Sequence, residues 1–512
     1  MIAERVPAFL SSRPAAHVFF ILLLAAALSP TLLVSIPAMA DYPNHLARMF
    51  LLSRADGPNP SPFYQIVWAL YPNLAMDLVV PFMARFMDVV TATKIFFLLS
   101  QLLVVTGAMA LERAVKNRIA ISGCVALMFL YSLPFAWGFV NFESGLGVAL
   151  WALAGAIALN EYNWLIRITF HAVSTLVLFA AHFFALGIYG FAIGVHELWR
   201  AWSKQRPLNE AVSRLLLLGL PALAVMAAMV STGGVIGGTG TYWFLQYKPL
   251  WPIRIMSGYS VVLSAMCVVG LIAGIYELAK HRLLRFSSSG AWLAAGFAGL
   301  YIAMPSKLFD TSFVDLRIIV AAALIMPAFV TVKLPDMRWR LAAAAGTAAI
   351  TLANVGIVLS VWLSYRADYA AMIGSFDRIA KKSLVLIAHS GAADDPPLGE
   401  LTEYPMYHAP VLAVHFADAF VPDLFNAPGK QPVMAKPAYR ELDIPYGGPV
   451  PLAILKAIAE KQKLTNVPRY IRDWPDEYDY LYLLGPRIPN PLPQILEELQ
   501  GQRRFVLYRI RK

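Results

Sequence analysis

Polar side chains that could carry out chemistry lie together in the segment 41–48. A carboxylate, an amide, an imidazole and a guanidinium stand at Asp41, Asn44, His45 and Arg48, directly after the apolar segment 18–40. If a helix continues through this segment, the spacing of four places Asp41 and His45 on one face. An ionisable residue held at the depth of a membrane helix is a candidate functional residue. The alternative is a polar helix end that stops the span and begins a loop.

Further ionisable residues stand in apolar surroundings and are candidates for the same reason. They are Asp77, Glu143, His182, Lys307 and Arg317. For His182, near the middle of a long apolar segment, the alternative is a hydrogen-bonded core histidine. Lys307 and Arg317 could instead form ion pairs with Asp310 or Asp315 at the mouth of a helix.

The composition requires a membrane environment. Of the 512 residues, 59% are hydrophobic and 14% are charged, which is more apolar surface than a soluble protein of this size needs. The net charge of +11 does not indicate nucleic acid binding, because Lys and Arg concentrate in short loops, where they set topology. The two cysteines lie in apolar segments without metal-ligand spacing, and no metal site is predicted.

The apolar segments predict about eleven membrane spans. The segment 168–199 is too long for one span, so we expect two short helices there, with a turn near Gly187. In the first loop, residues 41–92, the segment 74–90 reads as an amphipathic helix lying on the membrane surface. The other expected spans are 18–40, 93–111, 119–134, 144–159, 215–230, 256–278, 291–304, 318–332 and 341–363.

The distribution of Lys and Arg predicts the orientation in the membrane. One set of loops is richer in basic residues and should be cytoplasmic, which places the N-terminus inside and Asp41, Glu143, His182, Lys307 and Arg317 on the outer face. The C-terminus is thus expected on the outer side; the resemblance to bacterial proteins described below implies that the membrane is a bacterial inner membrane. Residues 38–40 also imitate a signal-peptide cleavage site, but the apolar segment before them has the length of a span, so we expect an uncleaved helix.

The composition changes after residue 365. Residues 366–512 carry strand-like patterns at 384–387, 478–483 and 504–510, helical patterns at 411–420, 452–463 and 494–499, and many prolines. This pattern predicts a soluble α/β domain on the outer side, following a transmembrane domain of residues 1–365.

This organisation resembles the GT-C superfamily, polytopic glycosyltransferases that use polyprenyl-phosphate-linked sugars, of the protein mannosyltransferase and aminoarabinose transferase types. The resemblance rests on Asp41 after the first span, the surface helix in the same loop, about eleven spans and a C-terminal outer domain. The form Asp-Tyr-Pro-Asn-His-Leu at 41–46 is similar to bacterial members. The family often shows a second acid close to the first, whereas Tyr42 occupies the neighbouring position here.

The resemblance implies sugar transfer at the outer face of the membrane, with Asp41 as general base. His45 would orient Asp41 or the acceptor, and Lys307 and Arg317 would bind the donor phosphate. Glu143, Asp77 and His182 are the candidates for the second acid or for acceptor binding. Some relatives use a divalent cation, but Asp41 and His45 alone are too few ligands to predict one.

Two other functions fit parts of the sequence. A non-catalytic envelope scaffold of GT-C-like fold would keep the outer domain but lose the need for Asp41. A transporter or flippase could use Glu143 and His182 along a pathway, although no internal repeat with paired broken helices is visible.

Overall fold

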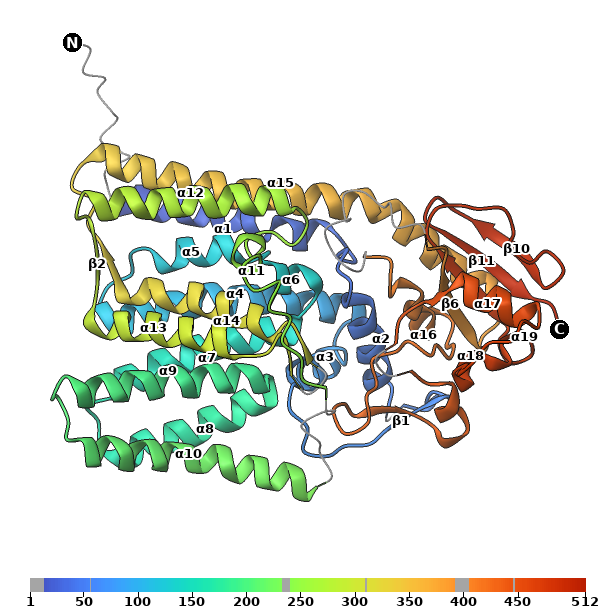
Figure 1. Ribbon diagram of the computed structural model, residues 1–512, viewed down its shortest axis with the longest axis horizontal. Helices are drawn as coiled ribbons and strands as arrows, with labels where there is room; N and C mark the ends of the chain where they lie inside the picture. The colour runs from blue at the N-terminus through green and yellow to red at the C-terminus, as the bar shows by residue number, and fades with distance from the viewer. Residues whose placement is uncertain (1–12, 56, 233–239, 309–310, 392–404, 445–446) are drawn as a thin grey trace, which may run out of the picture.

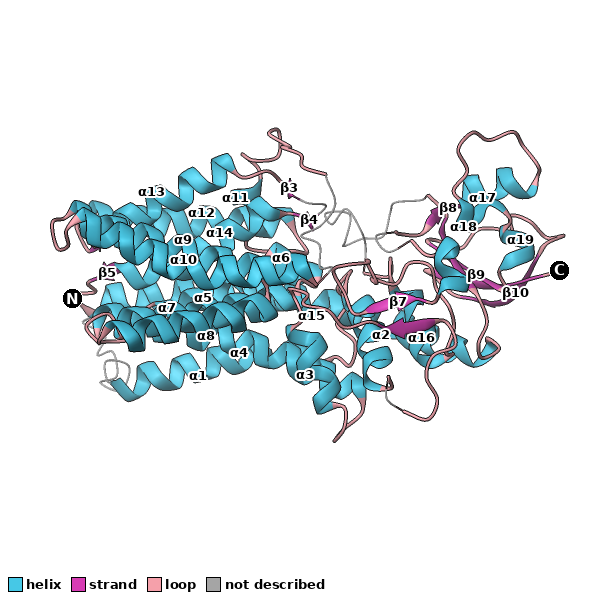
Figure 2. Cartoon of the chain, turned by 90° about the horizontal axis from the view of Figure 1, so that it is seen from below, coloured by secondary structure: helices cyan, strands magenta, loops and turns pink. Residues whose placement is uncertain are grey.

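A computed structural model describes residues 13–55, 57–232, 240–308, 311–391, 405–444 and 447–512. Long helices run side by side in one bundle, and a sheet domain lies beyond one end of it (Figures 1 and 2). The bundle helices are α1 (Arg13–Leu33), α4 (Val89–Lys116), α5 (Ser122–Phe129), α7 (Val140–Ala158), α8 (Trp164–Ala181), α9 (Phe183–Trp202), α10 (Leu208–Ser231), α12 (Val261–Lys280), α13 (Ser288–Ala303), α14 (Val314–Ile325) and α15 (Met337–Ser375).

The bundle is the membrane-embedded part of the protein. In the described ranges, seven helices are long and apolar enough to cross a membrane, namely α1, α4, α7, α8, α10, α12 and α15. The shorter or more polar helices α5, α9, α13 and α14 lie among them (Figure 1). The outermost helices α10 and α12 expose long rows of Leu, Val and Ile, as surfaces facing lipid require.

One predicted helix break is wrong in its position. The segment 168–199 does form two helices, but the break lies at His182 and not near Gly187, which is inside α9. His182 has extended backbone, with φ −164°, and its Nδ1 accepts a hydrogen bond from the Phe184 amide at 3.2 Å. The imidazole therefore caps α9 in the way that Ser or Asp usually does.

Other predicted spans end earlier or begin earlier than expected. Helix α1 ends at Leu33, so the segment 34–40 separates it from Asp41. Within 318–332, α14 ends at Ile325, and β5 (Val330–Val332) pairs antiparallel with β2 (Leu284–Phe286). A 3-10 turn, η2 (Met326–Phe329), connects the end of α14 to β5.

The segments at the sheet-domain end of the bundle carry short elements. The expected surface helix 74–90 is shorter, because α3 covers only Ala75–Met83, yet Leu78, Phe82 and Phe86 are exposed on it or just after it. The remaining short elements are α2 (Tyr42–Ser53), α6 (Leu133–Trp137), α11 (Trp251–Arg254) and the hairpin of β3 (Lys307–Leu308) with β4 (Thr311–Ser312).

The C-terminal domain is built on a five-stranded mixed sheet of order β10-β11-β9-β6-β8. Strands β8 and β9 flank β6 in parallel, whereas β11 pairs antiparallel with β9 and β10. The strands are β6 (Val385–His389), β8 (Val450–Pro451), β9 (Tyr480–Leu484), β10 (Leu496–Gly501) and β11 (Phe505–Ile510); the helices are α16 (Ala413–Phe416), α17 (Leu452–Ala459), α18 (Arg469–Arg472) and α19 (Trp474–Glu477), with 3-10 turns η3 (Phe376–Arg378), η4 (Ala409–Leu412) and η5 (Pro437–Leu442).

Two helix predictions in this domain need correction. The segment 494–499 belongs mostly to strand β10 and is not helical. The segment 411–420 holds only the short η4 and α16. The predicted helix 452–463 is present as α17 over its first two turns.

The sheet buries both of its faces. Alternate residues of one strand, such as Tyr482 and Leu483 of β9, belong to different apolar clusters, because successive side chains point to opposite faces. One cluster is continuous with the core of the helical bundle, and the other lies under α17 and α19. Strand β1 (Tyr64–Ile66) of the first loop also pairs with β7 (Val433–Ala435), so the domain and the bundle share one packed interior.

Candidate active site

Asp41 is held against a glycine turn between α6 and α7. Its amide donates a hydrogen bond to the Trp137 carbonyl at 3.0 Å. The next residue, Gly138, has φ +113°, and a Cβ built there would lie 3.0 Å from the Cβ of Asp41. Only glycine therefore combines this backbone conformation with so close an approach. The half-buried Asp41 stands at the N-cap of α2 without capping it through its side chain.

His45 follows one turn later on α2, as the spacing predicts. Its amide donates to the Asp41 carbonyl at 3.1 Å, and its ring hydrogen-bonds to the Gly138 backbone. Burial, reinforced by the charge of Arg48, lowers the pKa of His45 to about 3. The imidazole is therefore neutral at physiological pH and can orient a neighbour or an acceptor without adding positive charge.

The neutral state of His45 makes stability depend on pH. In the unfolded chain the imidazole takes up a proton near pH 6.5, whereas in the folded protein it does so only near pH 3. Stability is thus full above pH 6.5 and falls by about 1.4 kcal/mol per pH unit below it. We expect the apparent unfolding temperature of the detergent-solubilised protein to fall from pH 7.5 to pH 5 more steeply than that of His45→Gln.

Other groups titrate in the same range, so the comparison between the two proteins is the measurement. His415, whose pKa burial lowers to about 4, is present in both and cancels. If the unfolding temperature depends equally on pH in the wild type and in His45→Gln, then the pKa of His45 is the same in the folded and unfolded states, which would contradict the prediction.

Arg317 is a predicted site residue whose guanidinium interacts electrostatically with Asp41. It lies in the first turn of α14, is 6% exposed, and stacks over the Phe139 ring at 4.5 Å. Its Nη1 meets His182 Nε2 at 3.3 Å, and its Nη2 donates to the Ser312 carbonyl at 3.3 Å. The Asp41 carboxylate interacts electrostatically with this guanidinium. The structure therefore brings Asp41, His45, His182 and Arg317 together around the turn 137–139.

Glu143 lies in the same neighbourhood on the first turn of α7. Its amide donates to the Phe139 carbonyl at 2.9 Å, and its side chain is fully buried. Among the residues that the structure describes, neither carboxyl oxygen of Glu143 finds a hydrogen-bond partner, which is costly for a charged group away from water. An acid in such a place is a candidate for proton exchange or for contact with a bound polar group.

Two other predicted residues have different surroundings. Asp77 forms a buried ion pair with Arg48, in which Nε lies 2.8 Å from Oδ1 and Nη2 lies 3.0 Å from Oδ2. Lys307 lies on β3, with its amine 5.9 Å from the centre of the Tyr242 ring.

The alternative ion pairs can be compared with the structure only in part. Asp315 is 3.5 Å from Lys248 and accepts a hydrogen bond from Ser306 at 2.6 Å, rather than pairing with Arg317. Asp310 lies outside the described residues.

The C-terminal domain covers this end of the bundle. The Phe425 amide donates to Asn44 Oδ1 at 2.8 Å, and the Phe425 ring lies 6.3 Å from the His45 ring, centre to centre. On its other side Phe425 contacts His408 at 5.1 Å. The first turn of α2 is thus enclosed between the turn 137–139 and the loop 421–426.

Several residues that shape the site were not selected from the sequence. Asn141 accepts a hydrogen bond from the Met76 amide at 2.9 Å and donates to the Asn73 carbonyl at 2.8 Å, while Asn73 accepts from the Phe183 amide at 2.8 Å. These two amides fasten the starts of α3, α7 and α9 to one another. Asn73 and Asn141 could have been selected from the sequence, because they are polar residues in otherwise apolar segments. The sequence gives no indication of the importance of Gly138, because this importance depends on the close approach of Asp41.

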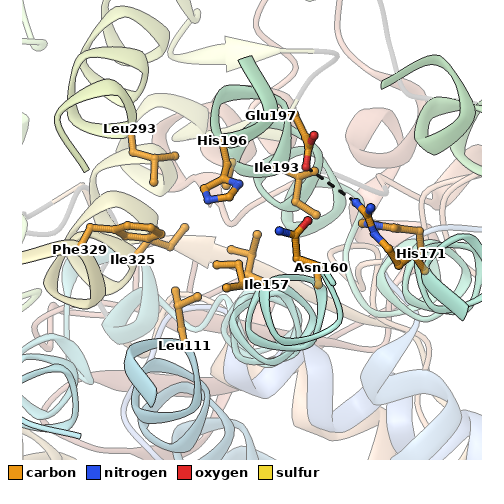
Figure 3. Close-up of a pocket in the computed structure, with 14 residues that line it drawn as sticks. Leu111, Ile157, Asn160, His171, Ile193, His196, Glu197, Leu293, Ile325 and Phe329 are labelled. Carbon is orange, nitrogen blue, oxygen red and sulfur yellow. Dashed lines mark ion pairs between the residues drawn. The ribbon is translucent and has the colours of Figure 1, made fainter. Parts of the chain in front are cut away.

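A pocket at the opposite end of the bundle is separate from this group. It is lined by residues of α4, α7, α8, α9, α13, α14 and η2. Asp41, Glu143 and Arg317 lie toward the other end of the bundle, at the starts of α2, α7 and α14 (Figures 1 and 3). Figure 3 shows Leu111, Leu293, Ile325 and Phe329 on one side of the pocket and Asn160, His171 and Glu197 on the other, with Ile193 beside the polar group. Glu197 is paired with Arg167 at 3.8 Å and with Arg206 at 2.5 Å.

No set of three or more His, Cys, Asp or Glu side chains within the described ranges could hold a metal ion. The group around Asp41 offers a carboxylate, a neutral imidazole and a guanidinium. Chemically it can accept a proton next to a group that stabilises negative charge.

Solved structures give the comparison that decides the fold. ArnT from Cupriavidus metallidurans, in the apo state and bound to undecaprenyl phosphate, matches this chain with a TM-score of 0.51 in both cases. Each match covers 97% of this chain and 98% of the ArnT chain at 11% sequence identity. The chain has the ArnT fold. The architecture expected from the sequence, a polytopic helical membrane part followed by a C-terminal α/β domain, is therefore confirmed at the level of the fold.

The ArnT likeness is one of structure and not of sequence. No protein-family model and no curated protein matches the chain. The ArnT fold spans both the helical bundle and the C-terminal domain, because nearly the whole of each chain is covered.

Proposed function

We propose that the protein is a membrane glycosyltransferase that moves a sugar from a polyprenyl-phosphate-linked donor to an acceptor hydroxyl. The observation that carries this proposal is the placement of Asp41 and Arg317 around the turn 137–139, under the C-terminal domain. The ArnT fold supports it, and one of the ArnT structures was solved with undecaprenyl phosphate bound.

In this proposal Asp41 is the general base. It accepts the proton of the acceptor hydroxyl as the acceptor oxygen forms a bond to the anomeric carbon. His45 stays neutral and positions Asp41 or the acceptor through the Gly138 turn. Glu143, Asp77 and His182 are the proposed second acid or acceptor-binding residues; the pairing of Asp77 with Arg48 and the open oxygens of Glu143 favour Glu143.

The bond that breaks joins the anomeric carbon to the phosphate oxygen, and the lipid phosphate leaves with the electron pair. A guanidinium presents two donors in a fixed fork that matches phosphate oxygens. Arg317 is proposed to bind this group, with Lys307 as a second cation from the adjoining hairpin. Stacking on Phe139 and Phe142 keeps the guanidinium plane oriented.

The proposed topology places the C-terminal domain outside a bacterial inner membrane and the N-terminus in the cytoplasm, with domains at 1–365 and 366–512. The support is that basic residues concentrate at the bundle end away from Asp41, as in Lys116 of α4, Arg200 of α9 and Lys280 of α12. Residue 366 lies within α15, which connects the two domains.

Arg317→Lys tests the phosphate-binding role. The substitution keeps the charge but removes the fork, so binding of the donor should weaken while the base remains in place. We expect kcat/KM for the polyprenyl-phosphate donor to fall by about 10- to 100-fold, mainly through KM, as for loss of a hydrogen bond to a charged group. The measurement is sugar transfer in liposomes at varied donor concentration.

Arg54→Lys is the matched control, because Arg54 lies at the same end of the protein in a partly exposed pair with Asp418. It should transfer sugar at the wild-type rate. Wild-type donor dependence in Arg317→Lys would remove Arg317 from the proposed mechanism.

A further inference from the structure

A buried tyrosine hydroxyl bonds to both of the chain segments that hold Asp41. Tyr259 lies just before α12 and is 1% exposed. Its hydroxyl donates to the Ala38 carbonyl at 2.9 Å and to the Ala136 carbonyl at 3.2 Å. Ala38 stands three residues before Asp41, and Ala136 directly precedes Trp137, whose carbonyl accepts the hydrogen bond of the Asp41 amide. The Tyr259 hydroxyl thus connects the two segments between which Asp41 is fixed.

A third group sets the direction of the hydroxyl proton. The indole Nε1 of Trp362 lies 2.7 Å from the Tyr259 oxygen, and an indole N–H can only donate. The Tyr259 oxygen therefore accepts a hydrogen bond from Trp362, and its single proton is shared between the two carbonyls. Trp362 is completely buried in α15, so water does not compete for these hydrogen bonds.

Both carbonyls need the hydroxyl as a donor. The Ala38 carbonyl belongs to the segment 34–40, which follows α1 and is not helical. The Ala136 carbonyl lies at the end of α6, where helix carbonyls have no partner within the helix. Both residues are fully buried, and a buried carbonyl without a hydrogen bond is costly. The hydroxyl therefore stabilises the approach of the segment 34–40 to the end of α6.

The backbone that presents Tyr259 is fixed to the same part of the bundle. The Gly258 amide donates to the Tyr131 carbonyl at 3.3 Å. A Cβ on Gly258 would overlap the side chain of Ala136, so glycine is needed for the chain before α12 to come this close to α6. The Tyr259 hydroxyl is therefore a fixed point for the two segments that it joins.

We propose that Tyr259 is a positioning residue for Asp41, because it joins the segment before Asp41 to the glycine turn and so sets the place of the carboxylate relative to Arg317. This inference rests on the proposed function, in which Asp41 is the general base. Arg317 is held separately, through Ser312 and His182. Loss of the Tyr259 hydroxyl should thus displace the base without moving the proposed phosphate site, and proton transfer depends steeply on such placement.

The test is Tyr259→Phe, which keeps the ring and removes only the hydroxyl. We expect kcat for sugar transfer in proteoliposomes to fall by about 10- to 100-fold, as for a misplaced catalytic group, while KM for the donor stays within about twofold of the wild type. Deuterium uptake should rise in peptides that cover residue 41, because the hydrogen bond of the Asp41 amide to the Trp137 carbonyl is loosened. This exchange measurement does not depend on any reaction.

Tyr131→Phe is the matched control. Tyr131 is a buried tyrosine whose ring also contacts Trp362, but its hydroxyl donates to the Ala27 carbonyl within α1 at 2.9 Å and not to the segment 34–40. This variant should lower the unfolding temperature as Tyr259→Phe does, with wild-type kcat and wild-type exchange at residue 41. An equal fall of kcat in the two variants would assign the effect to lost stability and overturn the proposal.

Asp41→Asn separates this inference from the proposed function. If Asp41→Asn is strongly impaired and Tyr259→Phe transfers sugar at the wild-type rate, the positioning role is wrong although the base is right. If Asp41→Asn retains transfer, the proposed function fails, and exchange of the Asp41 amide alone decides whether Tyr259 fixes this residue. Unchanged exchange in Tyr259→Phe would then overturn the inference as well.

Discussion

Replacing Asp41 by asparagine is expected to lower sugar transfer by a factor of about 10² to 10⁴, the usual range for loss of a general base. Asparagine has the same shape as aspartate, so the backbone N–H of residue 41 can still donate its hydrogen bond to the Trp137 carbonyl. The side chain does not cap α2, and the helix should form as before. The rate should therefore fall without a matching fall in the unfolding temperature.

The assay is transfer from a polyprenyl phosphate sugar to acceptor in proteoliposomes, with the unfolding temperature recorded in parallel. Asp88→Asn provides the control from the same loop, residues 41–92, because the Asp88 side chain accepts a hydrogen bond from the Thr91 amide at the start of α4 and asparagine caps equally well. Near wild-type transfer by Asp41→Asn would show that Asp41 is not the base, and would favour a non-catalytic role for the whole site.

Arg48→Met is expected to destabilise the protein by about 3–5 kcal/mol, as breaking a buried ion pair does. The side chains of Arg48 and Asp77 are 2% and 1% exposed, so removal of the guanidinium leaves a carboxylate that water cannot reach. The loss of stability comes mainly from the cost of leaving the Asp77 carboxylate buried without a partner, and less from the loss of the attraction between the two side chains. The double variant Arg48→Met/Asp77→Leu should therefore regain most of the stability.

Unfolding temperatures of the two single variants and the double variant give the coupling between the residues. Gel filtration of the detergent-solubilised proteins shows whether each is folded. If Arg48→Met is as stable as the wild type, or the double variant is the least stable of all, then Arg48 and Asp77 do not stabilise the protein by neutralising each other.

The helical bundle could be predicted from the sequence because the length of an apolar segment is a local property. The positions of helix breaks were harder to predict. Gly187 was the obvious breaker in its segment, yet a Cβ there would meet no atom within 4 Å, so this glycine lies harmlessly within α9. The break instead depends on His182, which caps α9 and meets Arg317 from α14.

Segment 494–499 shows the opposite problem. Its Leu and Glu residues favour a helix on propensity, but pairing with β11 makes it a strand. Tertiary contacts decide such cases, and a single sequence does not reveal them.

The sequence predicted which residues belong to the candidate site better than it predicted how they are arranged. Asp41, His45 and Arg317 were selected because they are polar residues at the ends of apolar segments, and the structure gathers them around one turn. The pairing of Arg48 with Asp77 joins residues on separate helices, so only the folded chain specifies it. The glycine requirement at 138 arises in the same way.

The length of α15 has a consequence for how the C-terminal domain is mounted. Its 39 residues extend about 58 Å at 1.5 Å per residue, nearly twice the ~30 Å hydrocarbon core of a bilayer. The part beyond the membrane carries Asp368 and Tyr369, which bond to Arg504 and to the Pro405 carbonyl. Because an α-helix behaves as a screw, one added residue would raise the domain by 1.5 Å and turn it by about 100°. Both the length of α15 and the rotation that it imposes on the C-terminal domain about the helix axis thus keep β7 paired with β1 and Phe425 in contact with Asn44.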